Sequence, residues 1–576
     1  MTSRHPDLSP AAGRFRHTTL NAVRGLRRFL PARTDWVPAS IGSDLLAGLM
    51  VALVALPLAL GFGASAGMGA SSGLITAVVA GAVAAVFGGS RVQVSGPTGA
   101  MTVVLIPIIA EHGADGVLVV GMLAGVMLLA LGFAGIGRVI RYLPVTVVEG
   151  FTAGIAIIIA LQQVPAALGM SAGHDSVLST TAQAIRAWFA SPQLLAPVVT
   201  IGAVALILVL ARVVRTLPGA LFAVVAVTVA NSVFGWGLAT IGAIPSHLPA
   251  PSLPSIAPGA LVSLMLPALA VAALAALESL LSATAADAMT VGSRHDPDRE
   301  LVGQGLANLA APLFGGVPAT AAIARTAVNV RSGARTRLAS LTHAAVLLFI
   351  VLVASGLVAE IPMVALAGVL IATAVQMVKV SSLRALARST RGDAAALILT
   401  AVATVVFDLV TAVLIGLVVA GFFAIRQTAR TARLDEIPLD ETDHAAEEQR
   451  LLDDHIVAFR IDGPLFFGAA HDFLLELTRV SHVQVVVLRL SRVTTLDATG
   501  AHVLADIIER LAHDGITVML SGAHPEHERV LREMGVHERL AHERHLFATT
   551  PEAIAHAREH VARVSRGTTP VAASLA

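Results

Sequence analysis

The sequence contains no cysteine, and only 13% of its 576 residues are charged. The absence of cysteine excludes disulfides, thiolate metal sites and a cysteine nucleophile. The formal net charge of +1 implies no nucleic-acid partner. A Walker loop and an HExxH motif are also missing, so neither ATP-driven work nor hydrolysis at a metal site of that kind has support. The histidines near the C-terminus lack a metal-ligand spacing, and we predict no metal, no cofactor and no enzyme activity.

Hydrophobic residues make up 55% of the chain, which is typical of a polytopic membrane protein with a soluble appendix. Many apolar segments approach the ~20 residues that a membrane helix needs. The first half contributes segments 44–66, 71–89, 97–111, 115–137, 145–169, 195–212 and 218–236. The second half contributes segments 258–288, 301–314, 318–331, 337–359, 362–379, 392–406 and 408–426. We therefore predict about fourteen membrane segments, seven in each half.

Two of these segments begin inside the membrane. The run Gly315 to Pro318 breaks any incoming helix, and residues 319–330 are again suited to a helix. Pro97 marks a matching break 221 positions earlier (318 − 97). One such break alone is an ordinary kink, but paired breaks in corresponding halves indicate a transport site between inverted repeats. A helix that begins in the membrane offers unpaired N–H groups and partial positive charge, which favour an anion.

Basic residues gather in alternate loops of this topology, with Arg186 as the exception. The positive-inside rule therefore places both termini in the cytoplasm of a multi-pass protein of the inner (plasma) membrane. Residues 1–40 are rich in arginine and lack the apolar core of a secretory signal, so we interpret them as a retained cytoplasmic tail at the lipid surface.

Hydrophobicity falls after the transmembrane region, which we assign to residues 41–430. An acidic linker (431–452), a soluble domain (453–564) and a disordered tail (565–576) follow. Strand-like runs cover 455–461, 483–490 and 516–521, and amphipathic helical runs cover about 470–480, 500–513, 523–534 and 551–563. The predicted fold class is thus an α-helical polytopic membrane protein with a small α/β domain built on a mostly parallel sheet.

Two charged residues stand out in the apolar region. Glu278 interrupts a membrane helix, at a cost of ~2.5–3.5 kcal/mol on insertion scales, and such acids indicate function. The alternative is a structural hydrogen bond to a neighbouring helix. Ser282 lies one turn away on the same face. Arg325, in the second half-helix, is the natural counter-charge; its alternative position is the cytoplasmic interface, where its side chain would reach out of the membrane. If the two residues face each other, protonation of Glu278 would free Arg325 and the helix ends to hold an anion.

Three blocks, residues 44–63, 87–105 and 276–334, resemble the SulP family, the bacterial relatives of the SLC26 anion transporters. The resemblance extends from about residue 40 to 564. It implies a core of inverted repeats with the third and tenth helices broken at the anion site, a homodimer, and a cytoplasmic STAS domain at the C-terminus. By position, it implies that Arg325 lies beyond an anion surrounded by Thr98, Gly99, Ala100, Thr320, Ala321 and Ala322. Glu278 would be the coupling acid, with Ser282 beside it.

Within the STAS domain, the run Leu496 to Gly500 resembles the DSSG loop of anti-sigma-factor antagonists, in which a serine is phosphorylated. Here Ala498 and Thr499 occupy the serine positions, and Thr499 keeps a hydroxyl. Asp497 and Thr499 are therefore candidate regulatory residues. The alternative is a loop that caps the following helix.

The resemblance implies secondary active transport of sulfate, bicarbonate or a C4-dicarboxylate by an elevator-like shift of the core against a gate of helices 5–7 and 12–14. Proton coupling is our first hypothesis, because the block around Glu278 and Arg325 resembles proton-coupled dicarboxylate transporters. The first-helix motif resembles the sodium–bicarbonate branch, in which a sodium ion replaces the charge of Arg325 and an aspartate replaces Glu278. Sodium-coupled bicarbonate uptake, an uncoupled anion channel and a STAS-based sensor stay open as alternatives.

Overall fold

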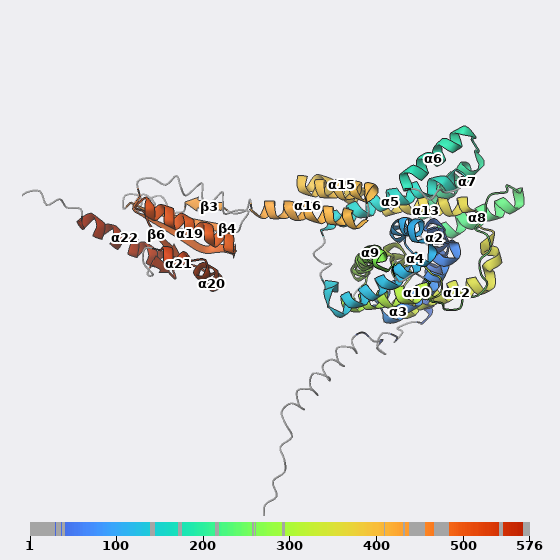
Figure 1. Ribbon diagram of the computed structural model, residues 1–576, viewed down its shortest axis with the longest axis horizontal. Coiled ribbons are helices and arrows are strands. Elements are labelled where there is room, and N and C mark those ends of the chain that lie inside the picture. Colours follow the sequence, from blue (N-terminus) through green and yellow to red (C-terminus); the bar gives the residue numbers. More distant parts are fainter. Residues whose placement is uncertain are drawn as a thin grey trace, which may run out of the picture. The chain divides into compact units, whose positions relative to one another are not determined.

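The computed structural model describes residues 41–138, 144–170, 176–213, 218–255, 259, 261–290, 294–407, 409–429, 433–436, 455–465, 483–540 and 545–567, together with residues 29, 31 and 36. The chain forms two compact units, Met1–Val418 and Val419–Ala576 (Figure 1). The domain boundaries drawn from the sequence at 430 and 453 stay predictions.

The first unit is helical. Its first half contains α2 (Ile41–Ser65), α3 (Ala70–Phe87), α4 (Gly99–Phe133), α5 (Val145–Ala167), α6 (Val177–Ala190), α7 (Leu195–Val213) and α8 (Gly219–Phe234). The second half contains α9 (Leu261–Met289), α10 (Pro297–Leu313), α11 (Ile323–Arg331), α12 (Arg337–Ala359), α13 (Met363–Met377), α14 (Val380–Ser389) and α15 (Arg391–Val406), and α16 (Leu409–Ala429) leads into the second unit. Every predicted membrane segment overlaps a helix, whereas α6 and α14 were not predicted.

The two predicted segments 97–111 and 115–137 are joined in one long helix, α4. The helix is interrupted at Gly113, whose φ of 68° and ψ of −170° are not helical. In the described part of the chain, nine helices are long and apolar enough to cross a membrane. Their outer surfaces are apolar as well: Val262, Leu266 and Leu357 are 73–80% exposed, which suits a face turned to lipid rather than to water. The total of fourteen crossings stays a prediction.

The helices of this unit pack in two groups. In the first group, α10 packs against α3 and α4, α12 packs against α2 and α3, and α9 packs along α4 and α11. In the second group, α13 packs against α5 and α7, and α15 packs against α5. Small residues allow these close approaches: a Cβ added to Gly125 of α4 would lie 2.8 Å from the carbonyl oxygen of Gly305 on α10. The groups touch where α2 meets α8 and α13 and where α4 meets α5.

The second unit contains a five-stranded sheet of order β3-β4-β5-β6-β7. Its strands are β3 (Arg433–Glu436), β4 (Ile456–Leu465), β5 (Val485–Leu496), β6 (Thr517–Ser521) and β7 (Leu546–Phe547), and its helices are α19 (Ala498–His513), α20 (Pro525–Glu533), α21 (Val536–Arg539) and α22 (Thr550–Gly567). The four strands β4 to β7 are parallel, as predicted, and β3 is antiparallel to β4.

Alternation along β5 explains how both faces of this sheet are covered. Val486 and Leu488 pack in the cluster that includes α19, whereas Val485 and Val487 pack in the cluster that includes α22.

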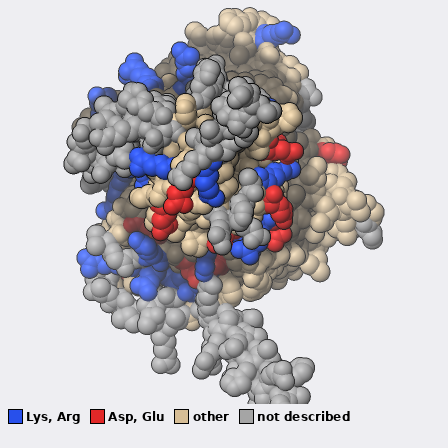
Figure 2. All heavy atoms as spheres, turned by 90° about the vertical axis from the view of Figure 1, so that its left-hand side faces the viewer, with Lys and Arg blue, Asp and Glu red and all other residues tan. Residues whose placement is uncertain are grey.

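Three expectations about the second unit differ from the structure or lie outside the described residues. β3 forms inside the predicted linker, α22 continues to Gly567 in the predicted disordered tail, and the predicted helix 470–480 lies outside the described residues. Basic and acidic side chains are interspersed on the face drawn in Figure 2.

Candidate anion-binding site

A two-residue antiparallel ladder joins the two broken segments. β1 (Ser95–Gly96) pairs with β2 (Thr320–Ala321), so that Ser95 is opposite Ala321 and Gly96 is opposite Thr320. The N–H of Ala322 extends the ladder by donating to the carbonyl oxygen of Val94 at 3.1 Å. Helix α4 begins three residues after β1, and α11 begins two residues after β2. The two broken segments predicted from the sequence therefore lie side by side, and the transport site that they indicate stays a prediction.

The start of α4 agrees with the sequence analysis. Thr98 is the N-cap residue, and its hydroxyl oxygen accepts from the N–H of Met101 at 3.4 Å. The first N–H groups of a helix have no acceptor within the helix, and this holds for those of Gly99 and Ala100. Both residues are buried, and their contact with an anion stays a prediction. Gly99 also packs closely against α5, because a Cβ there would displace the side chain of Ile159.

The start of α11 corrects the sequence analysis. We predicted a helix from residue 319, but α11 begins at Ile323 with Ala322 at the N-cap. The preceding residues are held in extended form: Asn308 binds both the N–H and the carbonyl of Ala319, and the Ser279 hydroxyl accepts from the N–H of Ala321. The available N–H groups therefore begin at Ile323, which is 43% exposed.

This shift also changes the register of the repeat. The N-cap residues Thr98 and Ala322 are 224 positions apart (322 − 98) rather than 221. Thr320 and Ala321 are 0% and 1% exposed, and the Thr320 hydroxyl lies 3.0 Å from that of Ser279. These two residues thus hold the ladder against α9, and their contact with an anion stays a prediction.

Arg325 lies inside the protein, with 1% of its surface exposed, so the alternative position at the interface is wrong. Its Nη2 donates to the carbonyl oxygen of Pro97 at 2.7 Å. Its Nη1 is buried and has no hydrogen-bond partner among the described residues. The space for this nitrogen exists because Gly96 has no side chain: a Cβ there would lie 2.6 Å from Nη1. An arginine N–H without an acceptor favours a negatively charged partner, and the contact of Arg325 with an anion stays a prediction.

Glu278 of α9 binds the other broken segment. Its Oε2 accepts from the hydroxyl of Thr98 at 2.9 Å. No direct ion pair within 4.0 Å joins Glu278 to Arg325 in the described chain, so the expected face-to-face pair is absent. Instead, the carbonyl oxygen of Pro97 binds the guanidinium of Arg325, and the hydroxyl of the next residue, Thr98, binds the carboxylate of Glu278. The two charges interact electrostatically over this longer distance.

Ser282 has a different environment from Glu278. Its hydroxyl donates to the hydroxyl of Thr326 at 3.1 Å, and Thr326 in turn accepts from the N–H of Val94 at 3.1 Å. Ser282 is 0% exposed. It therefore connects α9 to α11 and to the start of β1, and its role in ion coupling stays a prediction.

A row of buried polar residues on α10 supports the ladder and was not singled out from the sequence. Gln304 donates to the Ser95 hydroxyl at 2.7 Å and to Glu300 at 2.9 Å. Glu300 accepts from the N–H groups of Gly89 and Ser90, and Asn308 holds Ala319. The spacing 300, 304, 308 places all three residues on one face of a helix, and this was the signal that could have found them.

His343 of α12 was also missed. It is 1% exposed, and neither ring nitrogen has a hydrogen-bond partner among the described residues. It interacts electrostatically with Arg325. A single histidine in an apolar helix gives no periodic signal, so only the fold brings it to the site.

In the second unit, Asp497 caps α19 by accepting from the N–H of Gly500 at 2.7 Å. Thr499 is exposed in the first turn of the same helix. The geometry fits the capping alternative, and the regulatory role of Asp497 and Thr499 stays a prediction.

Comparison with known proteins assigns both regions. Residues 41–400 match the sulfate permease family. The chain belongs to this family. Residues 450–553 match the STAS domain. YvdB of Bacillus subtilis (strain 168), a candidate sulfate transporter, is 35% identical over 515 residues, which cover 88% of this chain and 95% of YvdB. The bicarbonate transporter BicA of Picosynechococcus sp. (strain PCC 7002) is 32% identical and covers 87% of this chain and 92% of BicA.

Solved structures agree with this sulfate permease assignment. The transmembrane domain of a cyanobacterial bicarbonate transporter BicA is 33% identical, with a TM-score of 0.61, and covers 64% of this chain and 97% of that domain. The structure of SLC26A9 covers 99% of this chain and 98% of that chain with a TM-score of 0.79; at 16% identity it shows the fold. The chain is therefore a multi-pass membrane transporter of anions, and not an enzyme.

Proposed function

We propose that this sulfate permease family member is a proton-coupled secondary active transporter of sulfate, bicarbonate or a C4-dicarboxylate in the inner membrane. The observation that carries the proposal is the meeting of two helix starts beside the buried, unpartnered Nη1 of Arg325. Each helix start contributes about half a positive charge, and the guanidinium contributes one more. The site thus carries about two positive charges when Glu278 is protonated and about one when Glu278 is ionised.

This difference in charge suggests how protons and anions are coupled. Glu278 is bonded to Thr98, the N-cap of α4, so its negative charge lies at the positive end of that helix. An ionised Glu278 competes with an anion for the positive charge of the helix starts and Arg325. When Glu278 is protonated, this positive charge is available to the anion. Proton and anion then bind together and leave together. The group formed by α2–α4 and α9–α12 carries both across by moving against α5–α8 and α13–α16.

Sodium-coupled bicarbonate uptake is the second candidate. The bicarbonate transporter BicA is 32% identical over 525 residues, and the first-helix motif resembles the sodium–bicarbonate branch. Against it, Arg325 supplies a permanent positive charge beside the site, which disfavours a second cation. Ile323 offers no side-chain oxygen to such a cation. Proton coupling therefore remains the first proposal, and the ion gradient is the variable that separates the two.

Uptake into proteoliposomes tests the proposal. An inward proton gradient should drive accumulation of labelled sulfate, bicarbonate or succinate, and a sodium gradient alone should not. Glu278→Gln should abolish accumulation against a gradient, because its amide cannot exchange a proton. Glu111→Gln, which alters an exposed acid on α4, is the matched control and should transport normally. His343→Gln examines the other titratable group beside Arg325. Accumulation by Glu278→Gln equal to wild type, with loss in His343→Gln, would move the coupling role to His343.

Anion affinity is the second part of this test. Arg325→Ala removes charge-assisted hydrogen bonds, each worth ~1.5–3 kcal/mol, and should weaken binding about 10- to 100-fold. Arg325→Lys keeps the charge and should recover part of this loss. Unchanged affinity in Arg325→Ala would remove the residue from the site.

A further inference from the structure

Helix α14 carries a cluster of exposed positive charge between α13 and α15. The helix has 10 residues, which at about 1.5 Å each extend for about 15 Å and cannot cross a bilayer core of about 30 Å. None of its residues is buried. The positive-inside rule assigns its charges to the cytoplasmic side of the membrane. Four exposed basic residues lie on α14 or directly beside it: Lys379, Arg384, Arg388 and Arg391.

The sequence of α14 gives it a polar side and an apolar side. Residues at spacings of three and four share one side of a helix. This spacing groups Ser381, Arg384 and Arg388 on one side, and it groups Val380, Leu383 and Ala387 on the neighbouring side. Val380 is 57% exposed. A helix with basic and apolar sides is suited to the boundary between lipid headgroups and acyl chains.

The neighbouring helices expose apolar side chains close to these charges. Val375 in the last turn of α13 is 52% exposed, and Ile398 and Val402 of α15 are 56% and 53% exposed. Ile398 follows Arg391 by seven residues, which is about 10 Å along the helix. The four basic residues thus lie where the apolar outer surface of the protein ends, which is the level of the lipid headgroups.

The nearby acidic groups do not neutralise this cluster. Asp393 of α15 accepts from the hydroxyls of Ser389 and Thr390 at 3.0 and 2.8 Å. Glu149 of α5 accepts from the hydroxyl of Ser382 at 3.3 Å. None of the four basic side chains has an ion pair among the described residues. Four positive and two negative charges leave an excess of two positive charges (4 − 2), so the cluster favours an anionic partner.

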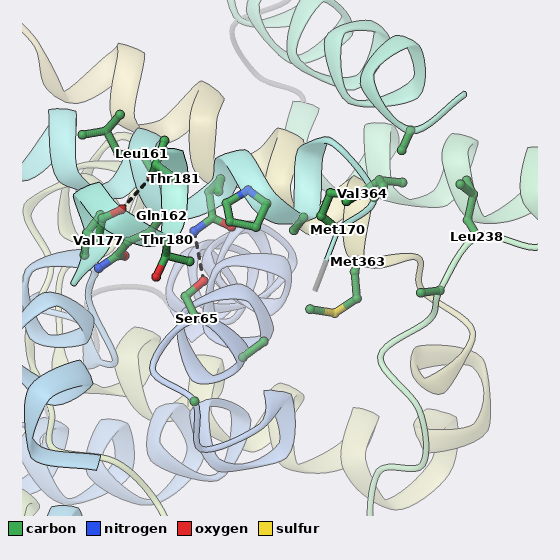
Figure 3. Close-up of a pocket in the computed structure, with 18 of the residues that line it drawn as sticks. Ser65, Leu161, Gln162, Met170, Val177, Thr180, Thr181, Leu238, Met363 and Val364 are labelled. Carbon is green, nitrogen blue, oxygen red and sulfur yellow. Dashed lines mark hydrogen bonds between the residues drawn. The ribbon is translucent and has the colours of Figure 1, made fainter. Parts of the chain in front are cut away.

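The opposite end of α13 lacks such charge. Met363 and Val364 in the first turn of α13 line a cavity of about 740 Å³, and its walls also include residues of α2, α4, α5 and α6 (Figure 3). The described residues that line this cavity include no charged side chain. The positive cluster at α14 is therefore a property of one end of α13 and not of both.

We propose that α14 binds anionic phospholipid of the cytoplasmic leaflet, with the lipid phosphate beside Arg384 and Arg388 and an acyl chain against Val380. Arginine offers a fork of N–H donors to phosphate. Helix α14 packs against α15 and α5, which belong to the second helix group. Bound lipid therefore holds this group at a fixed depth while the first group moves. This effect on transport rests on the proposed function, whereas the binding itself does not.

The absence of cysteine allows a single-site reporter of this binding. Ser381→Cys places one thiol at an exposed position beside both arginines, where it can carry a bimane fluorophore. The labelled full chain is reconstituted in phosphatidylcholine that contains a small fraction of nitroxide-labelled phosphatidylglycerol or phosphatidylcholine. Quenching then measures which lipid lies at α14. Phosphatidylglycerol should be preferred about 5- to 30-fold at low salt, the range for one or two basic residues per lipid, and less in about 1 M salt.

Variants test whether charge on α14 causes this preference. Arg384→Gln/Arg388→Gln should lower it at least about fivefold, and Arg384→Lys/Arg388→Lys should keep most of it. The matched control, Arg529→Gln/Arg558→Gln, removes the same charge from exposed positions of the second unit and should leave the preference unchanged. Equal quenching by both lipids, or an unchanged preference in the glutamine variant, refutes the proposal. Quenching by neither lipid means that a protein surface, such as a second copy of the chain, covers α14, and also refutes it.

Uptake assays complete the experiment. In vesicles with phosphatidylglycerol, Arg384→Gln/Arg388→Gln should lower the maximal rate of anion uptake and leave the half-saturating anion concentration unchanged. In pure phosphatidylcholine, the variant and the parent should transport at equal rates. Equal rates in both lipids, with lipid binding lost, refute the hold on the second helix group. A parent that transports no anion contradicts the proposed function, while quenching of the Ser381→Cys label still decides whether α14 binds lipid.

Discussion

Replacing Gly96 by alanine tests whether the position of the Arg325 guanidinium sets anion affinity. The new Cβ would lie 2.6 Å from Nη1 and 3.4 Å from Cζ of Arg325. A comfortable contact needs about 3.5 Å, so Nη1 has to move by about 1 Å. The movement strains the hydrogen bond from Nη2 to Pro97 as well, because the guanidinium is rigid and planar.

The size of the effect follows from the bonds that the movement disturbs. A hydrogen bond that involves a charged group is worth ~1.5–3 kcal/mol, and each 1.4 kcal/mol changes affinity about tenfold. Gly96→Ala should therefore weaken anion binding about 10- to 100-fold, a loss close to that of Arg325→Ala. The new Cβ would also lie 3.3 Å from the backbone Cα of Ala77, and Gly96 has a φ of 157°, which residues with a side chain rarely adopt, so Gly96→Ala also strains the backbone of β1.

Calorimetric titration of the purified protein with its transported anion measures this loss. Gly81→Ala is the matched control: its Cβ would approach the neighbouring Ser95 carbonyl oxygen to 3.3 Å and has no contact with Arg325, so binding should stay within a few-fold of wild type. In the Arg325→Ala background, Gly96→Ala should cost less affinity than it does in the wild type, since the guanidinium it displaces is gone and only the backbone strain in β1 remains. A full additional loss in that background, or wild-type affinity in Gly96→Ala, would refute the reasoning.

Three further predictions concern residues that support the fold. Asn308→Leu leaves the buried N–H and carbonyl of Ala319 unpaired, at ~1–3 kcal/mol each, so hydrogen exchange of the peptide that contains β2 should accelerate; unchanged exchange would contradict the clamp. Asp497→Ala removes the cap of α19 and should destabilise the second unit by about 1 kcal/mol in thermal unfolding, while Thr499→Ala should leave its stability unchanged. Partial burial and neighbouring positive groups lower the pKa of His560 from 6.5, so its contribution to stability is present above that pH and is lost as the pH falls below it. Exchange in α22, corrected for intrinsic rates, should therefore rise between pH 7.5 and 5.5, and His560→Gln should flatten this rise.

The helical part of the fold was predictable because apolar segments of membrane length are separated by polar loops. Because we searched for apolar segments of membrane length, we missed α6 and α14, which are amphipathic and too polar to resemble a membrane segment. β3 was hidden for a different reason. Its four residues lie in an acidic stretch, and they form a strand because β4 offers a free edge in the folded domain.

The site was predictable where a residue conflicts with its surroundings. Glu278 and Arg325 stand out as charges in apolar segments, and Pro97 stands out as a break. The start of α11 was not predictable, because residues 319–322 have good helical propensity and are drawn into extended form by Asn308 and Ser279 from other helices. Tertiary contacts decided that boundary.

The pairing of β1 with β2 has a consequence for biosynthesis. Ser95 enters the bilayer long before its partner Ala321 exists, because ~220 residues are translated in between, which takes about 10–45 s at ~5–20 residues per second. During that interval the edge of β1 and the bare end of α4 have no partner from the second half of the chain. Until residue 321 is made, these unpaired backbone groups therefore need another partner. Water inside the insertion machinery, or an insertase that covers polar backbone, would provide one.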